Sequence, residues 1–149
     1  MKKATILLLV CVFAVAGLAI AGKVPTPTDP PEGVKIISAA DVSKLMNGTA
    51  VKIIDMRKAL NYGKGHLPGA TSAPYKWTKK GNPAHRTGKY DMTKLPEDKG
   101  SQILFHSDGP NGWKSYYASK AAAAAGYKNV LWMREGFATW SEKGYSVEH

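Results

Sequence analysis

Residues 102–133 read QILFHSDGPNGWKSYYASKAAAAAGYKNVLWM, and they set the fold class. The run opens with apolar residues 102–106, which are typical of a buried strand. A turn-rich loop follows, and the alanine-rich residues 115–125 favour a helix that Gly126 ends. Residues 130–133 are apolar again and predict a second strand. A strand–helix–strand unit of this kind places two parallel strands in one sheet.

The same alternation continues on both sides of this unit. Residues 34–37 and 49–55 are short, β-branched or apolar runs that predict strands. Between them, Ser38-Ala39-Ala40-Asp41 resembles a capping box and begins a helix that Asn47-Gly48 ends. Further short elements are expected at residues 58–62 (helical turns), 70–73 (a strand) and 136–143 (a helix). The sequence therefore predicts an α/β fold with a mainly parallel central sheet and helices on both faces.

The first 21 residues have the pattern of a cleavable signal peptide. A basic start and an apolar run, residues 6–20, precede the small residues Ala19 and Ala21. An uncleaved anchor is the alternative, because residues 4–21 reach the lower limit of a membrane span. No basic cluster follows directly, so we expect cleavage between Ala21 and Gly22. The protein would then be periplasmic or otherwise exported, with no stable membrane span.

The amino-acid composition excludes several kinds of functional site. Cys11 is the only cysteine and would leave with the signal peptide, which excludes a disulfide framework and a Cys-rich zinc site. The four histidines are not spaced as a zinc pair on one helix, and we expect no metal and no cofactor. A formal net charge of +10 suits anionic partners. No stripe of basic and aromatic residues predicts a nucleic-acid partner.

Two segments are irregular. Residues 22–33 are rich in proline and predict an extended tether between the cleavage site and a domain. Residues 76–100 form a basic connector, which we interpret either as a solvated loop or as a functional segment. Trp77 in this connector is expected to be an exposed contact for a partner. Trp132 and Trp140 are expected to pack inside.

The loop between the strand at 102–106 and the following helix is the candidate site. Ligands of open parallel sheets bind beyond the carboxyl ends of the strands. Successive N–H groups of a glycine-containing loop, with a helix N-terminus behind them, can hold an anion or activate a nucleophile. A connecting turn without a ligand would have a similar composition. The candidate residues are Ser107, Asp108, Gly109, Asn111, Gly112, Trp113, Lys114 and Ser115.

Several spaced motifs resemble the rhodanese-like domain family. Ile54-Asp55-Met56-Arg57 is similar to its strand ending in Asp-x-Arg, and residues 62–70, YGKGHLPGA, to its Tyr-x-x-Gly-His-x-Pro-Gly-Ala signature. Residues 126–130 and 135–145 are similar to its closing section. The resemblance covers residues 34–148, which we take as the domain. It implies the rhodanese-like fold.

The resemblance implies that Ser107 stands at the position of the family's catalytic cysteine. That thiolate accepts a sulfane sulfur from a donor such as thiosulfate. One branch of the family has the loop Cys-x-Gly-Pro-x-Cys-Trp-Lys-Ser, and here Ser107 and Gly112 occupy both cysteine positions. A serine hydroxyl stays protonated near neutral pH and cannot form a persulfide. We therefore expect no catalytic residue of the sulfur-transfer kind.

A serine nucleophile would need a neighbouring base. His106 is adjacent, but adjacent side chains in a strand point to opposite faces. His66 is a mainly structural turn residue in the family. A non-catalytic hydroxyl at the mouth of the loop is therefore the favoured interpretation of Ser107.

Four residues are predicted to support the loop: Asp55, Arg57, His66 and Glu135. Asp55 and Arg57 either orient the loop or form a plain structural ion pair. In the family the arginine often meets a glutamate just before the tyrosine, where this chain has Asn61, so its partner is open. Glu135 would place a carboxylate near the pocket, where it either repels anions or pairs with Lys114 or Arg134. Trp113 is either a cover on the loop or a core anchor.

These features together predict an exported rhodanese-like protein that has lost sulfur-transfer activity. Its expected role is to bind a small oxyanion, such as thiosulfate, sulfite or phosphate, or another sulfur species. Docking of an exported partner protein through the same face is a variant of that role. A sulfurtransferase-type enzyme and a purely structural adaptor are the alternatives.

Overall fold

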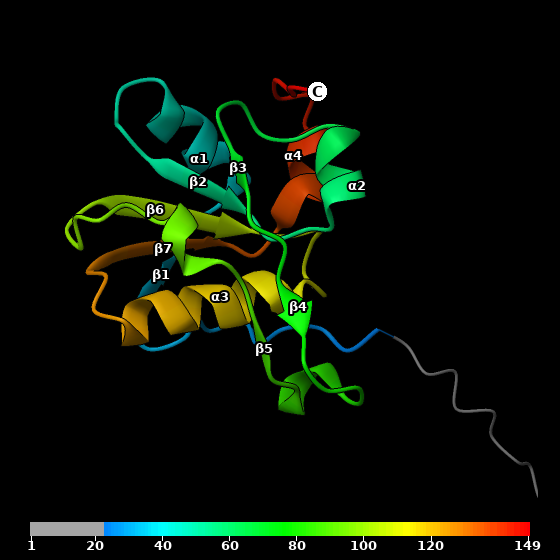
Figure 1. Ribbon diagram of the computed structural model, residues 1–149. Helices are drawn as coiled ribbons and strands as arrows, with labels where there is room; N and C mark the ends of the chain where they lie inside the picture. The colour runs from blue at the N-terminus through cyan, green and yellow to red at the C-terminus, as the bar shows by residue number, and fades with distance from the viewer. Residues whose placement is uncertain (1–22) are drawn as a thin grey trace, which may run out of the picture.

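A computed structural model describes residues 23–149; the predicted signal peptide lies outside this range. Five parallel strands form the central sheet in the order β1-β7-β6-β2-β3 (Figure 1). Their bounds are β1 Val34–Ile36, β2 Lys52–Asp55, β3 Thr71–Ser72, β6 Gln102–His106 and β7 Asn129–Met133. The predicted parallel α/β sheet is confirmed. The apolar runs of β2, β6 and β7 are buried because both faces of the sheet are covered.

Helices cover both faces of the sheet, as the alternation predicts. Helix α3 (Trp113–Ala124) lies on one face, and α1 (Ala39–Met46) and α4 (Gly136–Glu142) lie on the other (Figure 1). A short helix, α2 (Ala59–Gly63), follows β2. Strand β6 divides its side chains between the faces with period two: Ile103 and Phe105 join the core beneath α3, and Leu104 joins the core beneath α1 and α4.

Two elements begin two or more residues away from the predicted position, and the other boundaries agree to within one residue. Helix α3 begins at Trp113, two residues early, because Gly112 serves as its N-cap and the Ser115 hydroxyl donates to the Gly112 carbonyl. The strand expected at 49–55 begins only at Lys52, because the Thr49 N–H is engaged by the Leu45 carbonyl at the end of α1.

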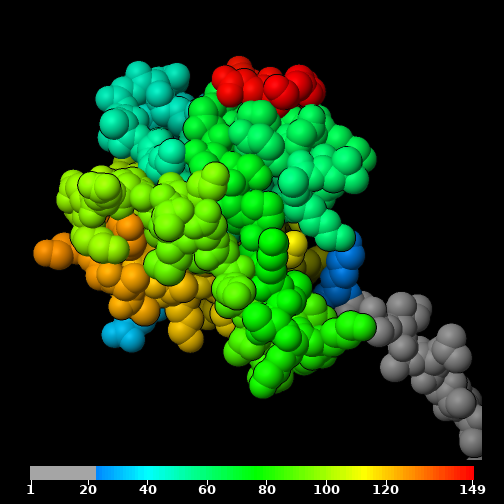
Figure 2. Space-filling view, viewed as in Figure 1, coloured from blue at the N-terminus to red at the C-terminus, as the bar shows by residue number. Residues whose placement is uncertain are grey.

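The basic connector contains regular structure and packs on the domain. Strands β4 (Lys76–Trp77) and β5 (Gly88–Lys89) pair antiparallel, and 3₁₀ turns η1 (Pro83–His85) and η2 (Met92–Lys94) flank β5. The Tyr117 hydroxyl of α3 donates to the carbonyls of Pro83 and Ala84, 3.0 and 2.8 Å away. Figure 2 shows the connector, in green, over the lower front of the molecule.

Trp77 is not the exposed contact that its place in the connector suggested. Its ring is half-buried and packs edge-on against Tyr75 and Tyr117, with centroids 5.2 and 5.8 Å apart. The surrounding aromatic side chains of the connector and α3 supply apolar area that the sequence pattern of the connector alone does not reveal. Trp132 and Trp140 are buried, as expected.

The proline-rich segment predicted as a tether lies against the domain rather than apart from it. Thr26 is buried, and both its N–H and its hydroxyl donate to the Pro110 carbonyl. Figure 1 shows this part of the chain, in blue, passing beside the N-terminal end of α3. Among residues 23–149, no helix combines the length and apolarity that crossing a membrane would require.

Candidate functional site

A hollow of about 170 Å³ lies beyond the carboxyl end of β6. The loop lines it with six of the predicted residues: Ser107, Asp108, Asn111, Gly112, Trp113 and Lys114. Trp77, Pro83 and Arg86 of the connector complete the wall. Sequence reasoning missed Pro83 and Arg86 as site residues. The basic composition of the connector was the only signal, because nothing local indicated which cation would reach the loop.

Two predicted loop residues do not line the hollow. Ser115 is buried, donates to the Gly112 carbonyl and accepts a hydrogen bond from Trp132 Nε1. A Cβ at Gly109 would meet the Glu135 carbonyl and the Ala138 side chain, so this glycine faces α4. Both residues therefore support the loop from behind.

Ser107 stands at the base of the hollow. The residue is 1% exposed, and its Oγ has no hydrogen-bond partner within residues 23–149. A Cβ at Gly112 would lie 2.9 Å from Ser107 Cβ and 3.1 Å from its Oγ, so the glycine leaves room beside the hydroxyl. A buried hydroxyl without a partner costs about 1–3 kcal/mol. Such a group is a ready hydrogen-bond donor for a ligand.

The loop backbone is clamped by α4. Phe137 N–H donates to the Ser107 carbonyl and Ala138 N–H to the Asp108 carbonyl, both at 2.9 Å. These donors belong to the first turn of a helix, where N–H groups lack intrahelical partners. A planar trans peptide directs its N–H opposite to its carbonyl, so the N–H groups of Asp108 and Gly109 point away from α4.

Not every loop N–H is available to a ligand. Gly112 N–H donates to the Gly109 carbonyl at 2.7 Å, and Trp113 N–H to the Asn111 carbonyl at 3.1 Å. The expected convergence of successive N–H groups is thus reduced, because the turn uses two of them to hold its own shape.

Charges of both signs surround the hollow. Lys114 is half-buried, and burial lowers its pKa while Asp108 opposes that shift. The Arg86 guanidinium carbon lies 5.2 Å from the centre of the Trp77 ring, and its Nε donates to the Gly81 carbonyl. Asp108 is the one carboxylate among the lining residues. The cationic side chains therefore outnumber the acidic one.

Asp55 and Arg57 form a buried ion pair behind the loop. Arg57 Nη2 lies 2.6 Å from Asp55 Oδ2 and 2.7 Å from the Gly65 carbonyl, and the guanidinium lies over the Phe137 ring at 3.9 Å. Asp55 is therefore the partner of Arg57, which the presence of Asn61 in place of the family's glutamate had left open. The pair joins the end of β2 to the following turn and to α4, so a structural role is the one the geometry supports.

His66 belongs to that turn and not to the hollow. Its ring stacks on Tyr62 with centroids 3.8 Å apart, and its backbone pairs with Glu148 in an antiparallel bridge. His66 Nε2 lies 3.8 Å from a Glu148 carboxylate oxygen. The predicted turn role is consistent with these contacts.

Glu135 pairs with neither of the predicted side chains. Its carboxylate accepts a hydrogen bond from Ala39 N–H at the start of α1, and it does not line the hollow. The unpaired N–H groups and the positive end of a helix attract a carboxylate in this way. Arg134 instead donates to Thr26 and Pro27. The Glu135 carboxylate is therefore engaged at the start of α1 rather than at the hollow.

His106 is fully buried at the end of β6. Nδ1 lies 3.3 Å from the Ser107 carbonyl, and Nε2 lies 3.7 Å from Asp55 Oδ2 with no hydrogen-bond partner among the described residues. Burial lowers its pKa below the ordinary 6.5; Asp55, the Ser107 carbonyl and Asp108 oppose the shift, and Arg57 adds to it. Within residues 23–149 no hydrogen bond joins His106 or His66 to Ser107 Oγ.

We expect His106 to make stability depend on pH. Below about pH 6.5 the unfolded chain binds a proton at this position that the folded chain excludes, so unfolding becomes easier as the pH falls. Above that pH the contribution is constant. Urea unfolding of the wild type and His106→Gln between about pH 5 and pH 7.5 should show a shallower pH slope for the variant. Equal slopes would contradict this expectation.

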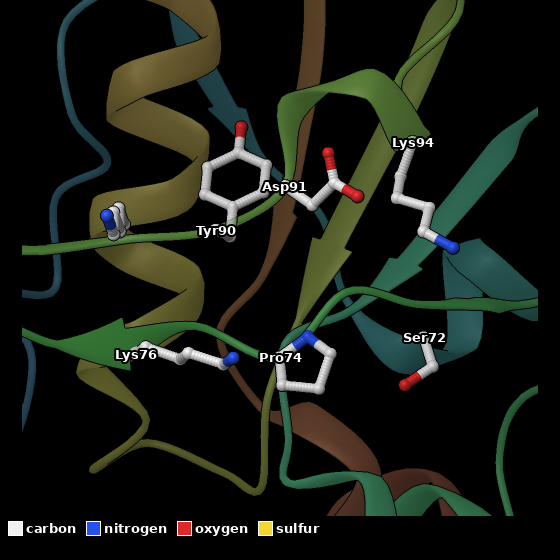
Figure 3. A pocket seen from close by; sticks show the side chains of 7 residues that line it. Ser72, Pro74, Lys76, Tyr90, Asp91 and Lys94 are labelled. Carbon is white, nitrogen blue, oxygen red and sulfur yellow. The ribbon is translucent and has the colours of Figure 1, made fainter.

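A larger hollow, about 440 Å³, lies between β3, the connector and η2 (Figure 3). Its lining residues are Ser72, Pro74, Lys76, Lys89, Tyr90, Asp91 and Lys94. The lysines are exposed, the Asp91 carboxylate caps η2 through Thr93, and the Tyr90 hydroxyl donates to the Ala118 carbonyl. No unpartnered buried side-chain atom of the described chain lines it. The loop hollow is therefore the better candidate, despite its smaller volume.

The described residues offer no cluster of three metal-ligating side chains.

Comparison with curated proteins gave no significant match. Solved structures with the same fold include thiosulfate sulfurtransferase from Pseudomonas aeruginosa, at 21% identity and a TM-score of 0.59, covering 78% of this chain and 20% of that one. The rhodanese-like domain of the Alr3790 protein from Anabaena sp. matches at 20% identity and a TM-score of 0.56, covering 80% of this chain and 79% of that one. The BH2092 protein from Bacillus halodurans matches at 22% identity and a TM-score of 0.58, covering 76% of each chain.

The family comparison agrees with the topology and with the motifs at Asp55–Arg57 and residues 62–70. The family model described as "Rhodanese-like domain" matches residues 38–143, which is most of the chain. The protein belongs to the rhodanese-like domain family.

Proposed function

We propose that the protein is an exported rhodanese-like domain that binds a small oxyanion in the loop 107–115 and does not transfer sulfur. The observation that carries the proposal is the buried, unpartnered hydroxyl of Ser107 at the base of a hollow walled by Arg86 and Lys114. Ser107 directly follows β6, where the family resemblance puts the catalytic cysteine.

The chemistry available to Ser107 is binding rather than group transfer. Sulfur transfer needs a thiolate, and residues 22–149 contain no cysteine. Activation of the hydroxyl would need a base, and no described side chain is hydrogen-bonded to it. A protonated hydroxyl donates a hydrogen bond to an anion, and the N–H groups of Asp108 and Gly109 point away from α4 on the same loop.

The surrounding charges favour an anion without making its binding tight. Arg86 and Lys114 attract it, and the basic connector raises its local concentration. Asp108 opposes it. The side chains at the rim remain in contact with solvent, so salt should screen the attraction. We expect a dissociation constant in the millimolar to high-micromolar range, about 4–6 kcal/mol of binding free energy.

The proposal predicts a localised response to oxyanions. On titration with thiosulfate, sulfite or phosphate, amide shifts should cluster at Asp108–Ser115 and weaken as salt rises. Ser107→Ala should weaken binding about tenfold, because one hydrogen bond to a charged ligand is lost. Ser72→Ala, which removes a hydroxyl in the larger hollow, is the matched control and should leave the affinity unchanged.

Other outcomes identify the alternatives. Amide shifts could instead spread evenly over the lysines, or the loop could show none up to an anion concentration of roughly tens of millimolar, above which binding is too weak to count as specific. Either result would favour a partner-docking scaffold or a purely structural adaptor. Transfer of sulfur from thiosulfate to cyanide should not exceed a protein-free control. Turnover by the unmodified protein would instead favour a sulfurtransferase, the activity for which the Pseudomonas aeruginosa protein is named.

A further inference from the structure

We propose that residues 24–27 form a strap that positions the anion-binding loop, with Thr26 as the positioning residue. This inference rests on the proposed anion site, which it deepens. The strap lies in the proline-rich segment just after the predicted cleavage position, in a stretch whose composition indicated only a tether. Its contacts end on the loop and on the turn that carries α4.

Thr26 holds the tip of the loop through one acceptor. Its N–H and its hydroxyl both donate to the Pro110 carbonyl, at 2.9 and 2.6 Å. The residue is only 3% exposed. Because the Pro110 carbonyl points to the strap, the N–H of Asn111 in the same peptide plane points away from it. Thr26 therefore fixes the orientation of the Asn111 N–H, and Asn111 lines the hollow.

Arg134 fastens the strap to the body of the domain. Its Nε donates to the Thr26 hydroxyl and to the Pro27 carbonyl, both at 3.0 Å, and its Nη2 to the Thr26 carbonyl at 2.9 Å. Arg134 lies two residues before α4, which holds the carbonyls of Ser107 and Asp108. The start of the loop is thus tied to α4, and its tip to the residues just before α4.

A further contact fixes the end of the loop. Trp113 Nε1 donates to the Val24 carbonyl at 2.8 Å, and the Trp113 ring lines the hollow. Thr26 and Val24 therefore contact the loop on both sides of Asn111 and Gly112. A strap that served only for packing would have no need of polar contacts to these two points of the loop, since each must repay the desolvation of its buried groups.

The test compares Thr26→Val with Thr26→Ser in chains expressed from the full sequence. Valine keeps the shape and the backbone N–H of Thr26 but removes the hydroxyl, whereas serine keeps the hydroxyl. For Thr26→Val we expect about fivefold weaker thiosulfate binding. Amide exchange at Asn111 and its neighbours should be faster, while exchange in β6 and β7 stays unchanged. Thr26→Ser should restore both, and Arg134→Gln should reproduce the valine effect.

The two readouts separate this inference from the proposed function. If the wild type binds no oxyanion, the proposed function fails, and loop exchange still decides whether the strap positions the loop. Unchanged loop exchange and affinity in Thr26→Val and Arg134→Gln would overturn the strap. Faster exchange throughout β6 and β7 would also overturn it, because it would show a general loss of stability rather than positioning.

Discussion

Replacement of Gly136 by alanine is expected to lower the free energy of unfolding by about 2–5 kcal/mol. Gly136 has a φ of +66°, which an alanine adopts at a cost of about 1–2 kcal/mol. Its Cβ would also lie 2.5 Å from Gly109 N and 2.7 Å from both the Asp108 carbonyl carbon and the Ser107 carbonyl oxygen. These are backbone atoms of the loop, so they can yield only if the loop moves.

Gly69→Ala is the matched control for Gly136→Ala. Gly69 has nearly the same φ, +69°, but an added Cβ would meet nothing within 4 Å. This variant should lose only the conformational cost of about 1–2 kcal/mol. Urea unfolding measures both, and the amide shifts of residues 107–112 should change in Gly136→Ala alone. Equal losses in the two variants would show that the loop does not depend on close packing against α4.

Removal of Arg57 is the second change with a large expected effect. In Arg57→Met the Asp55 carboxylate, which is fully buried, loses its cationic partner, and the Gly65 carbonyl loses a donor. A buried charge left without its partner typically costs about 3–5 kcal/mol. We expect a loss of that size in urea unfolding.

Two comparisons test whether the loss belongs to the ion pair. The double variant Asp55→Asn, Arg57→Met should lose less than the sum of the single variants, because it leaves no unpaired charge. Lys44→Ala removes an exposed pair with Asp41 in α1 and should leave the unfolding midpoint unchanged. A loss below about 1 kcal/mol in Arg57→Met would show that the pair contributes little.

The sheet could be predicted from sequence because each strand carries its own signal. The apolar runs of β2, β6 and β7 are buried on both faces, and the alanine-rich run before Gly126 can form little except a helix. The position of the loop follows from that order alone. The residues that line the hollow from within the loop could therefore be predicted from the amino-acid order.

The rest of the site depends on contacts between distant segments, which leave no local pattern. The Thr26 N–H and hydroxyl both donate to the Pro110 carbonyl, an acceptor of a kind that every residue carries, so the sequence does not mark the contact. Glu135 turns to the start of α1 because an unpaired N–H lies there, a fact of tertiary packing. Arg86 reaches the hollow only because β4 and β5 fold the connector back over the loop. Composition identified the connector as basic but could not say which cation mattered.

The attachments of the loop are made largely through main-chain atoms: the carbonyls of Ser107, Asp108 and Pro110 accept them. Main-chain groups persist when a side chain is exchanged. Evolution can therefore replace the residue at position 107 without dismantling the frame that surrounds it. A protein lineage that lost a reactive nucleophile could keep the binding site for its former substrate. Later mutations could then give that site a new chemical role.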